Sequence, residues 1–208
     1  MQLESIELNN WQSYRGNKHK FEFSGPDSTR NSAIIIGRNG KGKSAFFESL
    51  RFLLYGRKTL VDRDSSTTPK RVKPLVSENK IDKPLMCWEA WKSGSLSFGV
   101  KARVRIKDEL YTIERKYSST KKRPFEGDLK EEFYILEGTK KKKVPKPEEF
   151  ITSLLPIGIT KFFTIDGELL IDYRRIFSSE RAGMASDLEK ILRMGILDSA
   201  IFQTNSRK

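Results

Sequence analysis

The sequence contains one cysteine, Cys87, and one histidine, His19, among its 208 residues. A disulfide needs two cysteines and a zinc site needs several cysteine or histidine ligands, so neither organises this chain. We expect both residues to be ordinary packing or surface residues. No apolar run approaches the ~20 residues of a membrane span, and residues 1–5 do not have the pattern of a signal peptide. We therefore expect a reducing, cytoplasmic location and no membrane partner.

Acidic residues are also scarce relative to basic ones. There are 27 Asp and Glu against 40 Lys and Arg, which gives a net charge of +13 and a pI near 9.8. This balance favours polyanionic partners, DNA or RNA above all. The alternative is an acidic partner segment that balances the charge. The length suits one core with an inserted or appended subregion.

The central feature of the sequence is a strand, loop and helix pattern at 33–55. Residues 33–36 are Ala-Ile-Ile-Ile, which predicts a buried strand, and residues 37–44 satisfy G-x-x-x-x-G-K-[ST], the P-loop pattern. Residues 45–55 have apolar positions three and four apart, which predicts a helix. The three elements stand in the order that a phosphate site requires.

The residue types in this loop explain how it would hold a nucleotide. Glycines allow a tight turn and let backbone N–H groups approach phosphate oxygens, and the helix start adds its unpaired N–H groups and positive dipole end. Lys43 is expected to reach the β/γ phosphates, and the Ser44 hydroxyl to hold Mg²⁺. The predicted cofactors are ATP and Mg²⁺. The predicted nucleotide-binding residues are Arg38, Asn39, Gly40, Lys41, Gly42, Lys43, Ser44 and Ala45. The alternative is a glycine turn without a ligand.

The remaining pattern predicts a second, largely antiparallel region. Strands are expected at 2–8 and 18–23, a mobile surface excursion at 58–84 and a β lobe at 85–137. The segment 145–208 is expected to contain a short helix near 145–156, a strand at 159–165 and two more helices. Trp11 and Tyr14, between the first two strands, either pack in the core or flank a base, with core favoured.

Basic residues fall into two groups. Five lie on predicted strands, where a solvated polar face is expected: Lys101, Arg103, Arg105, Arg115 and Lys116. The runs 121–123 and 140–143 fall at predicted loop tips, where they either grip phosphates or stay solvated.

A second candidate site residue is Asp166, which follows the apolar run 162–165. A strand that ends in an acidic residue is where a P-loop enzyme places its Walker B carboxylate, so spacing predicts a catalytic, metal-facing Asp166 beside Lys43 and Ser44. Asp166 is not followed directly by the Glu that activates water in ATPases with an Asp-Glu pair, so no catalytic base is identified.

These residues carry a resemblance to a known class of ATPases. Residues 1–55 resemble the N-terminal segment of the SMC and SbcC class of ABC-type ATPases, with 9–14 at the family's N-F-x-x-[FY/H] element and 37–44 at its G-x-N-G-x-G-K-S loop. Lys41 departs from the family, which usually has a small residue there. Residues 162–168, Phe-Phe-Thr-Ile-Asp-Gly-Glu, resemble the F-F-x-F-D-G-E signature of the DndD family of SMC-like ATPases of bacterial DNA phosphorothioation. This resemblance assigns Asp166 to the Q-loop instead of Walker B.

The resemblance implies an α/β P-loop NTPase, with residues 1–208 forming the N-terminal half of an ABC-type ATPase head that carries an antiparallel β lobe. In the resembled family, a coiled coil joins this half to a C-terminal half with the signature motif, and ATP lies between two heads. The implied partners are DNA, the C-terminal half, a second head in a homodimer, and other DNA-modification or defence proteins. The implied function is an ATPase acting in DNA sulfur modification or phage defence, or in SMC/SbcC-type repair or recombination.

Two alternatives from other classes stay open. A small-molecule kinase or GTPase also uses a P-loop, but the strands between 95 and 136 do not alternate with helices. The second alternative is a basic DNA-binding scaffold in which the P-loop is vestigial.

Overall fold

The computed structural model describes residues 1–17, 19–23, 33–60, 72–155 and 157. The chain forms two compact units, Met1–Phe150 and Ile151–Lys208, and the functional features below lie in the first. The helices and strands are β1 (Gln2–Asn9), β2 (His19–Glu22), α1 (Lys43–Tyr55), α2 (Trp88–Lys92), β3 (Ser97–Ile106), β4 (Glu109–Ser118), β5 (Lys130–Glu137), β6 (Lys142–Lys143) and α3 (Pro147–Leu154). Short 3₁₀ turns occur at Arg57–Thr59, Lys80–Asp82 and Glu126–Asp128.

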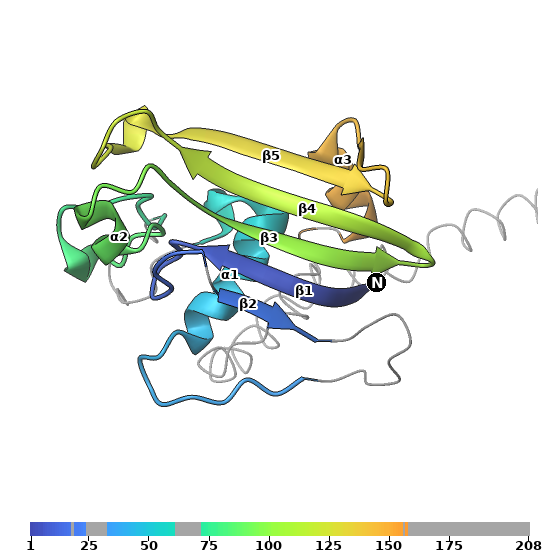
Figure 1. Cartoon of the computed structure of the whole chain (residues 1–208), viewed down its shortest axis with the longest axis horizontal. Coiled ribbons are helices and arrows are strands. Elements are labelled where there is room, and N and C mark those ends of the chain that lie inside the picture. The colour runs from blue at the N-terminus through green and yellow to red at the C-terminus, as the bar shows by residue number, and fades with distance from the viewer. Residues whose placement is uncertain (18, 24–32, 61–71, 156, 158–208) are drawn as a thin grey trace, which may run out of the picture. The chain divides into compact units, whose positions relative to one another are not determined.

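One antiparallel sheet forms the framework of the first unit (Figure 1). Its strand order is β2-β1-β3-β4-β5-β6, and every neighbouring pair is antiparallel. The predicted N-terminal strands are confirmed, and they join the strands of the β lobe in a single sheet, which the sequence did not indicate. β1 therefore connects the start of the chain to the lobe.

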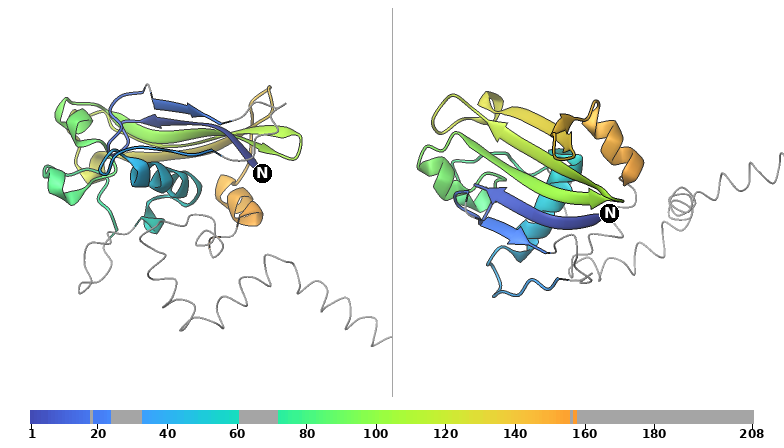
Figure 2. Two further views of the ribbon diagram at one scale, coloured as in Figure 1. Left: turned by 90° about the horizontal axis from the view of Figure 1, so that it is seen from below. Right: turned by 45° about the vertical axis from the view of Figure 1, so that its right-hand side comes forward.

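The core lies between this sheet and α1, which crosses one face of it (Figure 2). Alternate residues of β3 and β4 point toward α1, among them Phe98, Val104 and Ile113, all buried. Trp11 and Phe52 of α1 pack with ring centroids 4.6 Å apart. The prediction that Trp11 belongs to the core is confirmed.

The opposite face of the sheet carries charge pairs between neighbouring strands. Lys101 lies 3.7 Å from Glu7, and Lys116 lies 3.1 Å from Glu132. A register shift in β1 adds Glu4, whose carboxylate accepts from Arg105 at 2.5 and 2.8 Å. These basic residues are thus largely occupied by carboxylates on a solvated face.

Arg115 was expected on that same face, and this prediction is wrong. Its side chain points to the core side, where only 3% of its surface is exposed. The reason is the phase of alternation: Tyr111, Ile113, Arg115 and Tyr117 share the inward face of β4, whereas Lys116 points out.

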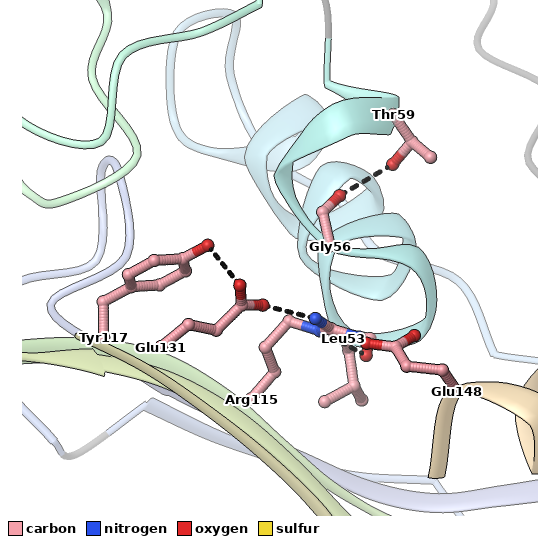
Figure 3. A network of polar contacts seen from close by, with 7 residues as sticks. All are labelled: Leu53, Gly56, Thr59, Arg115, Tyr117, Glu131 and Glu148. Atoms are coloured by element: carbon pink, nitrogen blue, oxygen red, sulfur yellow. Dashed lines mark hydrogen bonds and ion pairs between the residues drawn. The ribbon is translucent and has the colours of Figure 1, made fainter. Parts of the chain in front are cut away.

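Figure 3 shows how the buried Arg115 guanidinium is satisfied. It donates to the Leu53 carbonyl at 3.2 Å, to Glu148 at the start of α3 at 2.9 Å, and to Glu131 of β5. Glu131 also accepts from the Tyr117 hydroxyl at 2.8 Å. The guanidinium lies over the Phe133 ring, 3.8 Å from its centroid. Arg115 therefore joins the end of α1 to β5 and α3.

Two predictions for the middle of the chain need correction. The stretch 85–137 was expected to form a β lobe, and the helix α2 (Trp88–Lys92) within it was not predicted. The excursion expected at 58–84 is partly packed, because Leu60, Lys73 and Leu75 are buried. Lys73 bonds to Glu48 of α1. Residues 61–71 lie outside the described residues.

The predicted buried strand at 33–36 is wrong. Residues 33–38 form no strand, and Ile34 and Ile36 are 85% and 89% exposed. A run of β-branched residues becomes a buried strand only beside other strands, and none of the described strands pairs with it. The strand predicted at 159–165 and the helices after it lie outside the described residues.

Candidate functional site

The candidate site is the loop 37–44 at the start of α1. Gly40 and Gly42 have φ of +74° and +92°, in the left-handed region that favours glycine. The Lys41 N–H donates to the Arg38 carbonyl at 3.3 Å, which closes the turn. The loop therefore has the tight, glycine-dependent path that the sequence motif predicts.

The start of α1 is suited to an anion. Its N-cap residue is Gly42, no side chain caps the first N–H groups, and the first turn has no acidic residue. The first helical hydrogen bond runs from the Phe46 N–H to the Gly42 carbonyl at 2.9 Å. The N–H groups before Phe46, those of Lys43, Ser44 and Ala45, precede that first bond and are the ones a helix start offers to phosphate.

Lys43 bridges the two sides of the loop. Its ammonium donates to the Gly37 carbonyl at 2.7 Å and to the Arg38 carbonyl at 3.0 Å. An ammonium has three N–H donors, so one remains beyond these two bonds. Lys43 thus holds a positive charge over the loop, next to the start of α1.

These features fit a magnesium nucleotide. Left-handed glycines, an uncapped helix start and a lysine held over the loop are what triphosphate oxygens need. Ser44, exposed in the first turn, has the hydroxyl that holds Mg²⁺ in P-loop enzymes. The described residues contain no group of three or more His, Cys, Asp or Glu that would bind a metal without the nucleotide. Asp166 lies outside the described residues.

Two aromatic residues from the loop after β1 brace the site. The Trp11 indole donates to the Ala45 carbonyl at 2.7 Å, and the Tyr14 hydroxyl donates to the Gly42 carbonyl at 3.0 Å. A Cβ atom at position 42 would lie 3.0 Å from the Tyr14 oxygen, so Gly42 and Tyr14 are in close contact. Burial raises the pKa of Tyr14 above its ordinary value, which keeps this hydroxyl a donor in the neutral range.

A charged cluster fixes the first two turns of α1. Both oxygens of Glu48 accept from the Lys73 ammonium at 2.7 Å, and Gln12 donates to the same carboxylate at 2.5 Å. Lys73 is only 8% exposed. Lys73 is therefore engaged inside the protein.

The sequence motif locates the loop but not these bracing residues. Tyr14 was considered as core or as a base-stacking residue, not as a partner of the loop itself. The resemblance at 9–14 was the available signal, because that element precedes the P-loop in the resembled family. No signal in the sequence pairs Lys73 with Glu48, which lie 25 positions apart.

The comparison with protein families agrees with this geometry. A family model described as an AAA domain matches residues 5–193, which is most of the chain. The chain belongs to this AAA domain family. Among curated proteins, none matches the chain. The AAA domain is of the SMC/SbcC-like kind, which makes it a P-loop NTPase domain. Within the described part of the AAA domain, no helix is both long and apolar enough to cross a membrane.

Proposed function

We propose that the chain binds Mg²⁺-ATP at residues 38–45 and is the ATP-binding part of an ATPase that acts on DNA. The observation that supports nucleotide binding is the loop 37–44, in which Lys43 is held over the uncapped start of α1. We call this loop, with the first turn of α1, the phosphate cradle. The net charge of +13 supports the action on DNA, since phosphate contacts dominate the affinity of basic proteins for DNA.

The DNA transaction we propose is phosphorothioation or a related defence process. Its support is the sequence Phe-Phe-Thr-Ile-Asp-Gly-Glu at 162–168, which resembles the DndD signature, with Asp166 as the metal-facing residue. SMC/SbcC-type repair or recombination is the second candidate, because the elements at 9–14 and 37–44 are shared by that whole class. In either case we propose a cytoplasmic protein.

We further propose that the loop is completed by a C-terminal head half and by a second head. Ile34 and Ile36 support the first partner, because two exposed isoleucines directly before the loop are suited to pairing with a further strand. The second head, or another protein of the same system, would supply groups that promote hydrolysis. The isolated chain should therefore turn over ATP slower than about 1 per second, the low end of ordinary enzymes.

The test is calorimetric titration of the 208-residue chain with Mg²⁺-ATP. Lys43→Ala should weaken binding roughly 10- to 100-fold, because it removes a charged hydrogen-bond donor to phosphate. Lys58→Ala is the matched control: it removes the same charge from an exposed position outside the loop and should leave affinity unchanged. Equal binding by wild type and Lys43→Ala, or no binding by either, would make the loop vestigial and favour the basic scaffold.

A further inference from the structure

The connection between β4 and β5 exposes an aromatic side chain on a fixed loop. Phe125 is 67% exposed. A single exposed apolar residue needs no explanation by itself, so its surroundings decide whether it has a role. Two features set this one apart: the loop that holds it is tied down, and the charged residues around it are mostly basic.

Side-chain and backbone bonds fix the loop on three sides. The Trp91 indole of α2 donates to the Pro124 carbonyl at 3.0 Å, and Arg123 donates to the Lys92 carbonyl at 3.1 Å. Asp128 accepts from the Phe125 N–H at 3.1 Å, and Arg57 pairs with Glu126. The Phe125 ring is therefore presented from a backbone that is already ordered, so little conformational entropy is lost when it binds something.

The cations of this loop differ from those of the sheet face. Lys121, Lys122 and Arg123 are separated from Phe125 by Pro124 alone, and all three are exposed. Both carboxylates of the loop are already engaged, Asp128 by Lys121 and Glu126 by Arg57. In the described part of the chain, Lys122 and Arg123 have no carboxylate partner, whereas Lys101 and Lys116 on the sheet face do. The loop thus combines unneutralised positive charge with a bare aromatic ring.

We infer that the loop 121–125 binds single-stranded DNA, with Phe125 stacking on an unpaired base and Lys122 and Arg123 contacting the flanking phosphates. An aromatic ring needs an open base face, which single strands offer and a stacked duplex covers. The inference rests on the proposed action on DNA and adds to it the strand form and the contact residues.

The experiment measures binding of the full chain to a fluorescent oligothymidine of about 20 nucleotides and to a duplex of the same length. Phe125→Ala should weaken single-strand binding about 5- to 100-fold, the range of one base–aromatic stack, with little effect on the duplex. Phe125→Trp should retain binding. Ile81→Ala, which removes an even more exposed apolar side chain outside the loop, should leave binding to both nucleic acids unchanged.

The phosphate contacts are tested by salt dependence. The double variant Lys122→Gln/Arg123→Gln should reduce the slope of log affinity against log salt by about 1.4, since each single-strand phosphate contact contributes about 0.7. Matched thermal unfolding of all variants checks folding, because exposed side chains should not alter it.

Three outcomes would overturn the inference. If the wild type binds single strands and Phe125→Ala binds equally well, the loop assignment fails while the action on DNA stands. If Phe125→Ala weakens single-strand and duplex binding equally, Phe125 does not stack on an unpaired base, while the action on DNA still stands. If the wild type binds neither nucleic acid, both the loop assignment and the proposed DNA function fail, and Phe125 is a contact for a protein partner.

Discussion

Tyr14 connects the loop after β1 with the nucleotide-binding loop. Its hydroxyl donates to the Gly42 carbonyl, and its ring leaves room there only for glycine. The ring also packs edge-on against Phe21 of β2, with centroids 5.9 Å apart. Tyr14, which packs on the edge strand β2, thereby fixes Gly42, the N-cap residue of α1. The site therefore depends on side chains that do not touch a nucleotide.

Tyr14→Phe tests this positioning role. It removes one hydroxyl while keeping the ring, and a single neutral hydrogen bond is worth about 1 kcal/mol. We expect Mg²⁺-ATP affinity to fall about 2- to 10-fold in calorimetric titration, with the free energy of unfolding lowered by no more than about 1.5 kcal/mol.

Tyr134→Phe is the matched control. It also removes a hydroxyl, which donates to Glu114 at 2.5 Å on the outer face of the sheet. Because the outer face of the sheet does not contact the loop 37–44, the ATP affinity of Tyr134→Phe should equal that of the wild type. Equal losses in the two variants would show that Tyr14 has no specific effect on the site.

At the scale of elements, α1 is anchored at both ends by side chains from the sheet side. Trp11 and Tyr14 hold its first turn, and Arg115 holds its last through the Leu53 carbonyl. Gly56 ends the helix with φ of +72°, and a Cβ atom there would lie 3.0 Å from the Arg115 guanidinium. The helix that carries Lys43 is therefore held as a rigid element.

Arg115→Met should lower the free energy of unfolding by about 2–3 kcal/mol, measured by urea denaturation. The substitution keeps most of the side-chain volume but removes the donors to Leu53, Glu131 and Glu148. The loss stays below the ~5 kcal/mol extreme for buried pairs because Glu148 is largely exposed and can be solvated.

Arg103→Met is the comparison for this prediction. Arg103 lies on the outer face of the same sheet, with its side chain 48% exposed and 3.6 Å from Glu4. An exposed pair contributes less than about 1 kcal/mol. A loss as large as that of Arg115→Met would contradict the assignment of Arg115 as the buried anchor.

The elements differ in how far the sequence predicted them. The P-loop motif and the apolar spacing after it located α1, which ends at Tyr55 as predicted. The motif also located Lys43 in the site. α2 was missed because five residues are too few to show a helical period. Arg115 was assigned to the wrong face because its charge was given more weight than the alternation of β4, which places it with Ile113 and opposite Lys116. The bonds from Trp11 and Tyr14 to the loop span 34 and 28 positions, beyond any local pattern.

For the whole molecule, the segment before the nucleotide loop stands apart from the sheet. Ile34 and Ile36 are exposed although their sequence is that of a buried strand. A local pattern predicts how a segment behaves beside a suitable neighbour, but it does not supply the neighbour. The described sheet ends at β2 and β6, and neither pairs with residues 33–36.

Ile36→Thr distinguishes the exposed arrangement from a buried strand. In this chain the substitution should change the free energy of unfolding by less than about 0.5 kcal/mol in urea denaturation, because the side chain is already solvated. Val104→Thr, at a position of β3 that is 2% exposed, should cost about 1–3 kcal/mol by burying a hydroxyl. Similar losses for both would show that residue 36 is buried in solution.

The strand order also has a consequence for folding kinetics. β3, β4 and β5 follow one another in sequence and in the sheet, whereas β1 reaches β3 across the whole nucleotide loop and α1. Side-chain bonds to β3 from β1 and from Asn10, the residue after it, join positions 101 and 87 apart. Closing so long a loop costs entropy before any contact is gained, so the meander β3–β5 should form first and β1 should dock late. The phosphate cradle, braced by residues that follow β1, is then among the last parts of the chain to become native.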